Sequence, residues 1–417
     1  MDRFDRIPYR LYHDRAIYER ELERIFMGDT WSFLGFEAEI PRPGDFRTSV
    51  VGETPVIVDR ATDGHVHAFV NRCSHRGALV RLEGYGNAAA HACLYHHWEY
   101  DLTGALTAVP FEKGIMGESG MPPAFDRARH GLTALKVASV AGVLFGTFSK
   151  TVEPIEDYLG PTLLAHLKRT FNRPLKILGY QRQLFAGNWK MYPENVRDHY
   201  HGGLLHGFQR AFAINRTSHA AVSRMDATFR HGILAVETPL EELDRAPAEA
   251  EPDRPLRPLA AALGSGGALE LQDPRLLEFV PEFPDHYSTA IASIFPNCTI
   301  QQLRNALGGR QIRPKGPDAF ALVYTLVGFA DESEAMTRHR LRQANLVGPA
   351  GFVSLEDGEA LRACQEGHAR TDAASLVQMG GTGPIADSDV RLDDVMLRGF
   401  WSYYARVMDL DAREFTR

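Results

Sequence analysis

The chain has 417 residues, of which 44% are hydrophobic and 24% are charged, and its formal net charge is −7. This composition is typical of a folded globular protein of about two domains, and it excludes a disordered chain, a collagen-like repeat and a coiled coil. The net negative charge argues against a nucleic-acid partner, and the apolar runs are far shorter than the ~20 residues that a transmembrane helix needs, so we expect no membrane partner.

The first part of the chain is predicted to be a helical segment followed by a β domain. Residues 7–35 carry apolar residues at helical spacing on a charged background. The six residues before them carry charges of both signs and form no apolar signal segment, so we expect a cytoplasmic protein. Short β-rich runs at 54–58 and 66–70 alternate with turn signals, which predicts a small antiparallel β domain. The apolar run at 140–148 is expected to be a buried strand that closes this domain.

The pattern after residue 150 is mixed. Helices are predicted at 155–172, 335–347 and 393–408, and strands at 296–304 and 319–328. Residues 239–270 are rich in Pro, Ala, Glu and Gly and are predicted to form a loop or a mobile cover. The expected fold class is therefore α+β, with an antiparallel β domain followed by a larger domain of helices around a central antiparallel sheet.

Two short motifs in the β region each pair a cysteine with a histidine. Cys73 and His75 form C-x-H, and seventeen residues later Cys93 and His96 form C-x-x-H. Two thiolates and two imidazoles suit either zinc or a two-iron two-sulfide cluster that has histidine on one iron. Zinc fingers place both cysteines in one knuckle and both histidines in another. Here each motif supplies one of each, which favours the cluster.

The sequence from 36 to 154 resembles the Rieske domain of ring-hydroxylating oxygenases, on the C-x-H-R-G of the first motif and the C-x-x-H-x-W of the second. The resemblance implies that Cys73 and Cys93 bind one iron and that His75 and His96 bind the other. It also implies that segments 1–35 and 155–417 together form a catalytic domain with a mononuclear iron. Neutral histidine ligands raise the potential of such a cluster, which suits it to pass electrons to that iron.

A second set of metal-binding residue types lies between 188 and 206. Glu194, Asp198, His201 and His206 form E-x3-D-x2-H-x4-H. On one continuous helix the first three would share a face, and Gly202-Gly203 would let the last histidine turn back toward it. Two imidazoles and one carboxylate are the donor set of non-haem Fe(II) oxygenases.

This stretch resembles the iron-binding segment of the same family, on its N-W-K, E-N and D-x-x-H-x4-H elements. The resemblance implies that His201 and His206 bind Fe(II), and that Asp198 bridges an iron histidine and a Rieske histidine, His96, across a subunit interface. Residues 347–358 resemble the family's G-P-A-G segment, which places the third iron ligand at Asp357. The neighbouring Glu356 is the alternative.

The C-terminal region resembles the large subunits of terephthalate, anthranilate and salicylate oxygenases, on stretches such as 313–315 and 398–401. The resemblance implies that the substrates are a small aromatic carboxylate and O2, and that a reductase or ferredoxin donates the electrons. It further implies a trimer of α subunits with a small β subunit. A buried carboxylate needs a cation, and arginine suits it. Arg310 and Arg398 are the candidates, and Arg304 and Arg313 are weaker ones.

We therefore expect the terminal oxygenase α subunit of a dioxygenase, which adds both oxygen atoms to the ring as a cis-dihydrodiol. A monohydroxylase or demethylase of the same superfamily is the alternative within this class. A Rieske electron-transfer protein without oxygenase activity and a zinc-stabilised binding module are the alternatives from other classes. Colour distinguishes a zinc-stabilised module from a Rieske protein, because a zinc protein is colourless and a Rieske protein is red-brown.

Overall fold

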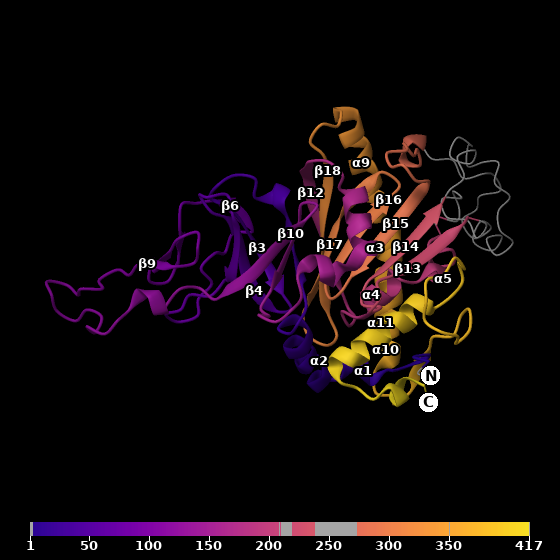
Figure 1. The fold of residues 1–417 in the computed structure, drawn as a ribbon, viewed down its shortest axis with the longest axis horizontal. Helices are drawn as coiled ribbons and strands as arrows, with labels where there is room; N and C mark the ends of the chain where they lie inside the picture. The colour runs from indigo at the N-terminus through magenta and orange to yellow at the C-terminus, as the bar shows by residue number, and fades with distance from the viewer. Residues whose placement is uncertain (1–2, 208, 210–218, 238–272, 350, 417) are drawn as a thin grey trace. The chain divides into compact units, whose positions relative to one another are not determined.

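The computed structural model describes residues 3–207, 209, 219–237, 273–349 and 351–416 (Figure 1). The predicted loop at 239–270 lies outside these residues. The chain forms two compact units, one of Leu22–Ile155 and the other of Met1–Glu21 with Glu156–Arg417.

The Leu22–Ile155 unit is built on a seven-stranded antiparallel sheet with the strand order β2-β11-β10-β5-β4-β3-β6. The unit also contains a three-stranded sheet, β7-β8-β9, and the second cysteine motif lies in the turn between β7 and β8. The predicted strands at 54–58 and 66–70 are confirmed. The strands are β2 (Ser32–Phe36), β3 (Asp45–Val51), β4 (Thr54–Arg60), β5 (Val66–Val70), β6 (Tyr85–Asn87), β7 (His91–Ala92), β8 (Glu99–Tyr100), β9 (Leu106–Ala108), β10 (Ala134–Val140) and β11 (Val143–Thr147).

Residues 140–148 cover the turn and the second strand of the hairpin formed by β10 and β11. This second strand, β11, is the predicted buried strand. All five residues of β11 are buried. The two-residue turn before β11, Ala141-Gly142, has φ of 50° and 78°. Positive φ at both positions suits a tight hairpin turn, because it matches the twist of the flanking strands.

The helical prediction for 7–35 is only partly right. The segment contains β1 (Arg6–Pro8), α1 (Arg10–His13), α2 (Arg15–Glu21) and the π-helical η1 (Leu22–Phe26), but it then enters β2. Every residue of β2 is buried. A short, fully buried strand has no alternation of polar and apolar residues, so its pattern cannot be distinguished from a buried helix.

The second unit contains another seven-stranded antiparallel sheet, ordered β12-β18-β17-β16-β15-β14-β13. Strands β13 to β18 form a meander, and β12 pairs with β18 at the edge. The predicted strands at 296–304 and 319–328 are confirmed as β16 and β18. The bounds are β12 (Leu175–Phe185), β13 (Ala221–Met225), β14 (Gly232–Glu237), β15 (Tyr287–Ile294), β16 (Cys298–Leu303), β17 (Ala306–Pro314) and β18 (Phe320–Phe329), with β19 (Ala374–Leu376) paired to β1.

Helices pack on this sheet. Helix α9 packs on β17 and β18, α10 on β12 and α4, and α11 on β13. The predicted helices at 155–172, 335–347 and 393–408 are confirmed, and so is the α+β fold class. The helices are α3 (Ile155–Thr170), α4 (Met191–Asn195), α5 (His199–Gly202), α9 (Glu334–Val347), α10 (Phe352–His368) and α11 (Val395–Met408), with short turns η2 (Glu37–Glu39), η3 (Arg127–Arg129), η6 (Pro274–Leu276) and η7 (Ala412–Phe415). Among the described residues, no helix combines the length and apolarity needed to span a membrane.

Two candidate metal centres

The two cysteine–histidine motifs lie on loops with the same backbone hydrogen bonding. In each loop the cysteine N–H donates to the carbonyl of the fifth residue after it, at 2.8 Å for Cys73 and 2.9 Å for Cys93. The N–H of the fourth residue donates back to the cysteine carbonyl, at 2.9 Å in both loops. That fourth residue has a left-handed backbone in each case, with φ of 74° at Gly77 and 54° at His97. The loops are therefore two copies of one turn, which presents each cysteine in the same way.

The four predicted cluster residues come together at the ends of these loops. Cys73 and Cys93 are buried, and the half-buried rings of His75 and His96 lie with their centroids 4.7 Å apart. Burial raises the pKa of the Cys93 thiol, and the adjacent Cys73 thiol raises it further, against backbone N–H groups that lower it. Two adjacent buried thiols ionise together only where a cation compensates them.

The donor set of this site fits a Rieske cluster. The Nδ1 atom of His75 is buried and has no hydrogen-bond partner within the described part of the chain. Buried polar atoms are normally paired, so such an atom marks a place for a ligand. The ring of His75 stacks on Trp98 at 4.8 Å, which fixes its direction. Tyr100 lies outside both motifs. Its hydroxyl is 3.3 Å from Cys73 Sγ and 2.9 Å from Ser74 Oγ.

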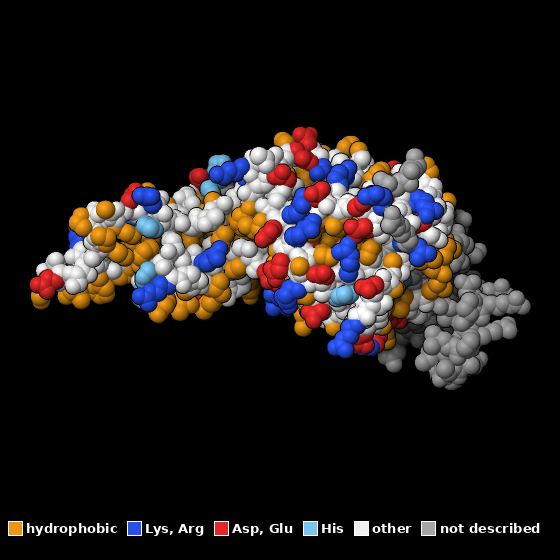
Figure 2. Space-filling view, turned by 90° about the horizontal axis from the view of Figure 1, so that it is seen from below, with side chains coloured by type: hydrophobic (Ala, Val, Ile, Leu, Met, Phe, Trp, Pro, Cys, Tyr) orange, Lys and Arg blue, Asp and Glu red, His pale blue; other side chains and the backbone are white. Residues whose placement is uncertain are grey.

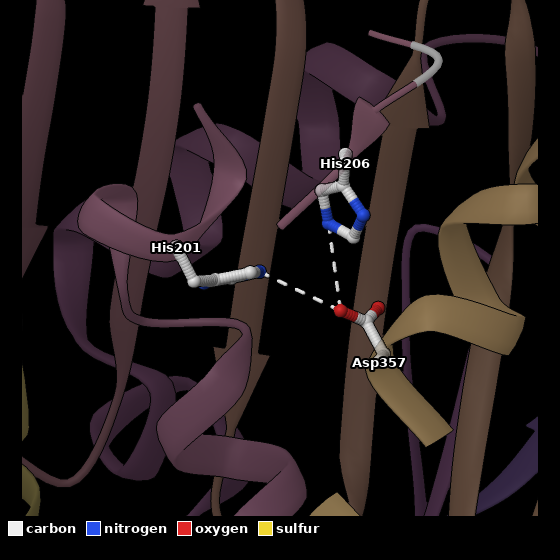
Figure 3. Close-up of side chains that lie close together, drawn as sticks. All are labelled: His201, His206 and Asp357. Carbon is white, nitrogen blue, oxygen red and sulfur yellow. Dashed lines mark ion pairs between the residues drawn. The ribbon is translucent and has the colours of Figure 1, made fainter. Parts of the chain in front are cut away.

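The second unit brings His201, His206 and Asp357 together (Figure 3). One possible ligand atom from each residue lies within 4.8 Å of the other two. The Nε2 atoms of His201 and His206 are 3.6 Å and 3.4 Å from Asp357 Oδ1. The histidines come from the connection between β12 and β13, and the carboxylate from the second turn of α10. Two imidazole nitrogens and one carboxylate oxygen at this spacing fit a mononuclear iron.

The prediction of one helix through residues 194–201 is wrong. Helix α4 ends at Asn195, and α5 begins at His199, with Asp198 as its N-cap in an extended conformation. The Asp198 carboxylate accepts hydrogen bonds from the N–H groups of Tyr200 (2.6 Å) and His201 (3.3 Å). Aspartate competes with the helical backbone for such N–H groups, so it favours a helix start over a helix interior.

Glu194 consequently lies outside the metal site. Its carboxylate accepts hydrogen bonds from the indole N–H of Trp401 (2.6 Å) and the hydroxyl of Tyr12 (2.9 Å). Burial raises the pKa of Glu194 to about 7.

Asp198 instead contacts the site through the His201 ring. The Nδ1–H of His201 donates to Asp198 Oδ2 at 3.2 Å, which leaves Nε2 facing Asp357. Burial raises the pKa of Asp198, but hydrogen bonding and the charge of His201 outweigh it and lower the pKa overall. A carboxylate on the outer nitrogen of a ligating histidine fixes its tautomer and its direction.

Two further residues, Glu356 and Asn195, complete the surroundings of the triad. The Nδ1–H of His206 donates to Glu356 Oε2 at 3.0 Å, so this imidazole also has a carboxylate behind it. The side-chain amide of Asn195 donates to Asp357 Oδ1 at 3.2 Å and lies 3.4 Å from His201 Nε2. Glu356 is visible in the sequence only as the neighbour of Asp357, and the E-N element alone does not show where Asn195 points.

The triad lines one part of a cavity in this unit. Another part of the lining is apolar, with side chains from β14, β15, β16, α9 and α10: Leu234, Val236, Ile291, Leu303, Leu346, Val347 and Val353. Arg310 on β17 also lines the cavity, as does Arg304. Arg398 on α11 is not among the described residues that line it, and its guanidinium donates to the Gly383 carbonyl at 2.6 Å.

Arg310 is a buried cation whose hydrogen-bonding capacity is only partly used. One terminal NH2 group donates to the hydroxyl of Tyr192. Neither Nε nor the other terminal nitrogen has a partner among the residues that the structure describes. Burial lowers the pKa of Arg310, but the Tyr192 and Tyr324 hydroxyls and Asp357 outweigh it and raise the pKa. The guanidinium therefore stays charged, with donors available to a ligand.

Comparison with known protein families matches both units. Residues 30–119 match the Rieske [2Fe-2S] domain, and residues 172–409 match the ring hydroxylating alpha subunit (catalytic domain). The chain therefore belongs to the family of ring-hydroxylating oxygenase alpha subunits, which are oxidoreductases. The predicted resemblance and the predicted cofactors, a Rieske [2Fe–2S] cluster and a mononuclear iron, are confirmed at this level.

Similar proteins match over nearly the whole chain. The chain is 42% identical to the anthranilate 1,2-dioxygenase large subunit of Burkholderia cepacia, over 97% of this chain and 93% of that protein. It is 40% identical to the terephthalate 1,2-dioxygenase terminal oxygenase component subunit alpha 2 of Comamonas sp. (97% and 95%), and 41% identical to the salicylate 5-hydroxylase large oxygenase component of Ralstonia sp. (97% and 94%). The crystal structure of naphthalene 1,2-dioxygenase from Rhodococcus sp. superposes with a TM-score of 0.77 at 23% identity, covering 97% of this chain and 94% of that chain, which shows a shared fold.

Proposed function

We propose that this chain is the terminal oxygenase subunit of a system that hydroxylates an aromatic carboxylate, most simply by cis-dihydroxylation of the ring. The observation that carries the proposal is one cavity that contains the His201, His206 and Asp357 triad, apolar walls and Arg310. A benzene ring fits apolar walls, and its carboxylate fits the available donors of a buried guanidinium. The relatives that act on anthranilate and terephthalate support this substrate class.

In this proposal His201, His206 and Asp357 hold the mononuclear Fe(II). The iron supplies the capacity to bind and activate O2 beside the ring. Asp198 and Glu356 hold the two imidazoles through their Nδ1–H groups, so that each Nε2 lone pair faces the metal position. Asn195 steadies the Asp357 carboxylate from the side. The apolar walls exclude water from the reacting face of the ring.

The Leu22–Ile155 unit is proposed to hold the Rieske cluster, within the predicted bounds 36–154. Cys73 and Cys93 bind one iron, and His75 and His96 bind the other. The catalytic domain then comprises residues 1–35 and 155–417. The two histidine rings are half-buried, whereas the cysteines are buried, so the histidine side of the cluster is the one that a partner can approach.

We propose that Asp198 links the two centres through His96 of the partner subunit. Its carboxylate already accepts the Nδ1–H of His201 and remains about one-fifth exposed, so part of it is open to a second donor. A head-to-tail contact that closes by rotation gives a ring, and a trimer is the expected form.

The surface of the Leu22–Ile155 unit supports association between subunits. Hydrophobic side chains gather at the end of this unit that holds β9, on the left of Figure 2. Phe111 and Ile115 are 73% and 65% exposed, and Met116 is fully exposed. Exposed apolar patches of this kind mark interaction surfaces. Because similar proteins are named as large or alpha subunits, we also propose a small β subunit, and a reductase or ferredoxin as the electron donor.

The test is a product assay under isotopically labelled O2. The iron-loaded protein with a compatible reductase receives benzoate, anthranilate, salicylate and terephthalate, and the products are analysed by mass spectrometry. Two labelled atoms in one product establish dioxygenation. One labelled atom supports the alternative, monohydroxylation, which the similarity to a salicylate 5-hydroxylase favours. If none of the acids yields a product while both metal centres are loaded, the aromatic-carboxylate proposal is wrong.

A further inference from the structure

The cavity of the proposed iron site contains a second arginine, far from the first along the sheet. Arg310 on β17 pairs with Thr299 on β16, and Arg304 follows five residues after that partner, just beyond the end of β16. At ~3.3 Å per residue, the two arginine backbones lie ~16 Å apart along the strands. Both arginines nevertheless line the same cavity, with apolar side chains around them. The cavity therefore contains a cation at each of two places along the sheet.

Arg304 has no anionic partner in the part of the chain that the structure describes. One of its terminal nitrogens donates to the Leu277 carbonyl, and its guanidinium lies 5.7 Å from the Phe279 ring. Its Nε is buried and finds no hydrogen-bond partner in the described ranges. Burial lowers the pKa of Arg304 to about 10. Arg304 is half-buried. Taking a cation partly out of water without a counter-charge is costly, and an anion that binds beside it offsets that cost.

The backbone holds Arg304 in a conformation that a non-glycine residue seldom adopts. Its φ is 53°, and its N–H donates to the Ser288 carbonyl at 2.7 Å. The next residue, Asn305, anchors the turn: its N–H donates to Gln343 Oε1 at 2.8 Å, and its carbonyl accepts from Arg340 at 2.6 Å. Arg304 and Asn305 form the two-residue turn between β16 and β17, and a positive φ at the first position suits a tight hairpin turn. The turn therefore has a fixed shape, and Arg304 does not depend on a ligand to be placed at the cavity.

A hydroxyl group lies next to this cation. Thr289 on β15 pairs with Leu303, the residue before Arg304, and it also lines the cavity. Gln343 lines the same part, but its amide is used, because Oε1 accepts from Asn305 and Nε2 donates to the Glu278 carbonyl at 2.6 Å. Among the described residues, Arg304, through its Nε–H, and the Thr289 hydroxyl can donate to a ligand at this end.

We propose that Arg304 and Thr289 form a second anion-binding position, which recognises a carboxylate on the ring carbon opposite the carboxylate held by Arg310. The substrate class that this predicts is an aromatic 1,4-dicarboxylate. This inference rests on the proposed function, since it takes the first carboxylate at Arg310 as given. It narrows that function, because benzoate, anthranilate and salicylate have no acidic group at the opposite carbon.

The test compares binding of three acids to the iron-loaded protein without O2, by titration calorimetry. Terephthalate has the second carboxylate, 4-nitrobenzoate has a neutral group of the same shape, and benzoate has neither. We expect the wild-type protein to bind terephthalate at least ~10-fold more tightly than 4-nitrobenzoate, as a charge-assisted hydrogen bond allows. Arg304→Gln should lower terephthalate affinity ~10–100-fold and change benzoate affinity less than ~3-fold. Thr289→Val, which keeps the side-chain shape, should lower terephthalate affinity ~3–10-fold.

Controls separate the possible failures. Arg342→Gln removes a nearby arginine that pairs with Asp273 at 3.6 Å and should change no affinity. Equal binding of terephthalate and 4-nitrobenzoate by the wild-type protein overturns the second position, as does an equal loss of benzoate and terephthalate affinity in Arg304→Gln. If that variant does not fold, Thr289→Val and the wild-type comparison decide the question. Failure of the wild-type protein to bind any of the three acids instead contradicts the proposed function itself.

Discussion

Replacing Arg310 with glutamine tests how the cavity recognises a carboxylate. The structure leaves Nε and one terminal nitrogen of Arg310 available, since no described residue accepts from them, and Tyr192 uses the other terminal group. A hydrogen bond to a charged group contributes ~1.5–3 kcal/mol, so the two donors together contribute ~3–6 kcal/mol. Residual bonding by glutamine and the ordering of the substrate reduce this to ~3 kcal/mol, which is ~100-fold in affinity.

The assay is the ratio of kcat/KM for benzoate to that for benzamide, its neutral analogue, with iron content measured for each variant. Arg310→Gln should lower this ratio ~100-fold. Arg310→Lys should lower it less, because lysine keeps the charge but loses the planar pair of donors. Arg313→Gln is the matched control, because Arg313 lies three residues further along β17 and is not among the described residues that line the cavity. An unchanged ratio in Arg310→Gln with full iron content would refute the reasoning.

Three further predictions concern carboxylates. Asp198→Asn keeps an N-cap side chain, so the stability of the protein should change by less than ~1 kcal/mol. Single-turnover product formation by the pre-reduced variant should slow ~10–100-fold. An unchanged rate would count against the bridging role of Asp198. Glu356→Gln should weaken iron binding ~10–100-fold in a chelator competition, because Glu356 holds the His206 ring. Glu359→Gln, on the exposed side of the same helix, is the control and should leave iron affinity unchanged. Equal iron affinity of the Glu356→Gln variant and the wild-type protein would exclude an orienting role for Glu356. Burial raises the pKa of Glu194 from its usual 4.5 to about 7, so the folded protein retains a proton that the unfolded chain releases above pH 4.5. The wild-type protein should therefore lose up to ~3 kcal/mol of stability relative to Glu194→Gln as the pH rises from about 4.5 to 7, and urea unfolding with the same pH dependence in both would contradict this.

The sequence alone determined the family, the cofactors and much of the secondary structure. The spacing of the cysteine and histidine residues carries this information because each motif is local. A turn of a few residues places Cys73 relative to His75, and the same turn recurs at Cys93 and His96. The long helices and the strands β16 and β18 were also predictable, since their apolar residues repeat with the period of the element.

The tertiary structure decided which polar residues share a site. The helical spacing of Glu194 and Asp198 suggested a common face, but Asp198 caps a separate helix and Glu194 is buried against Trp401 instead. Arg310 and Arg398 were both predicted from the sequence as candidates to bind the substrate carboxylate. Of these two, only Arg310 is among the described residues that line the cavity. The burial of Glu194 against Trp401 depends on packing between segments 207 residues apart, which no local pattern shows. A linear pattern specifies which side chain a segment offers, whereas the neighbours that the fold brings to it decide what that side chain contacts.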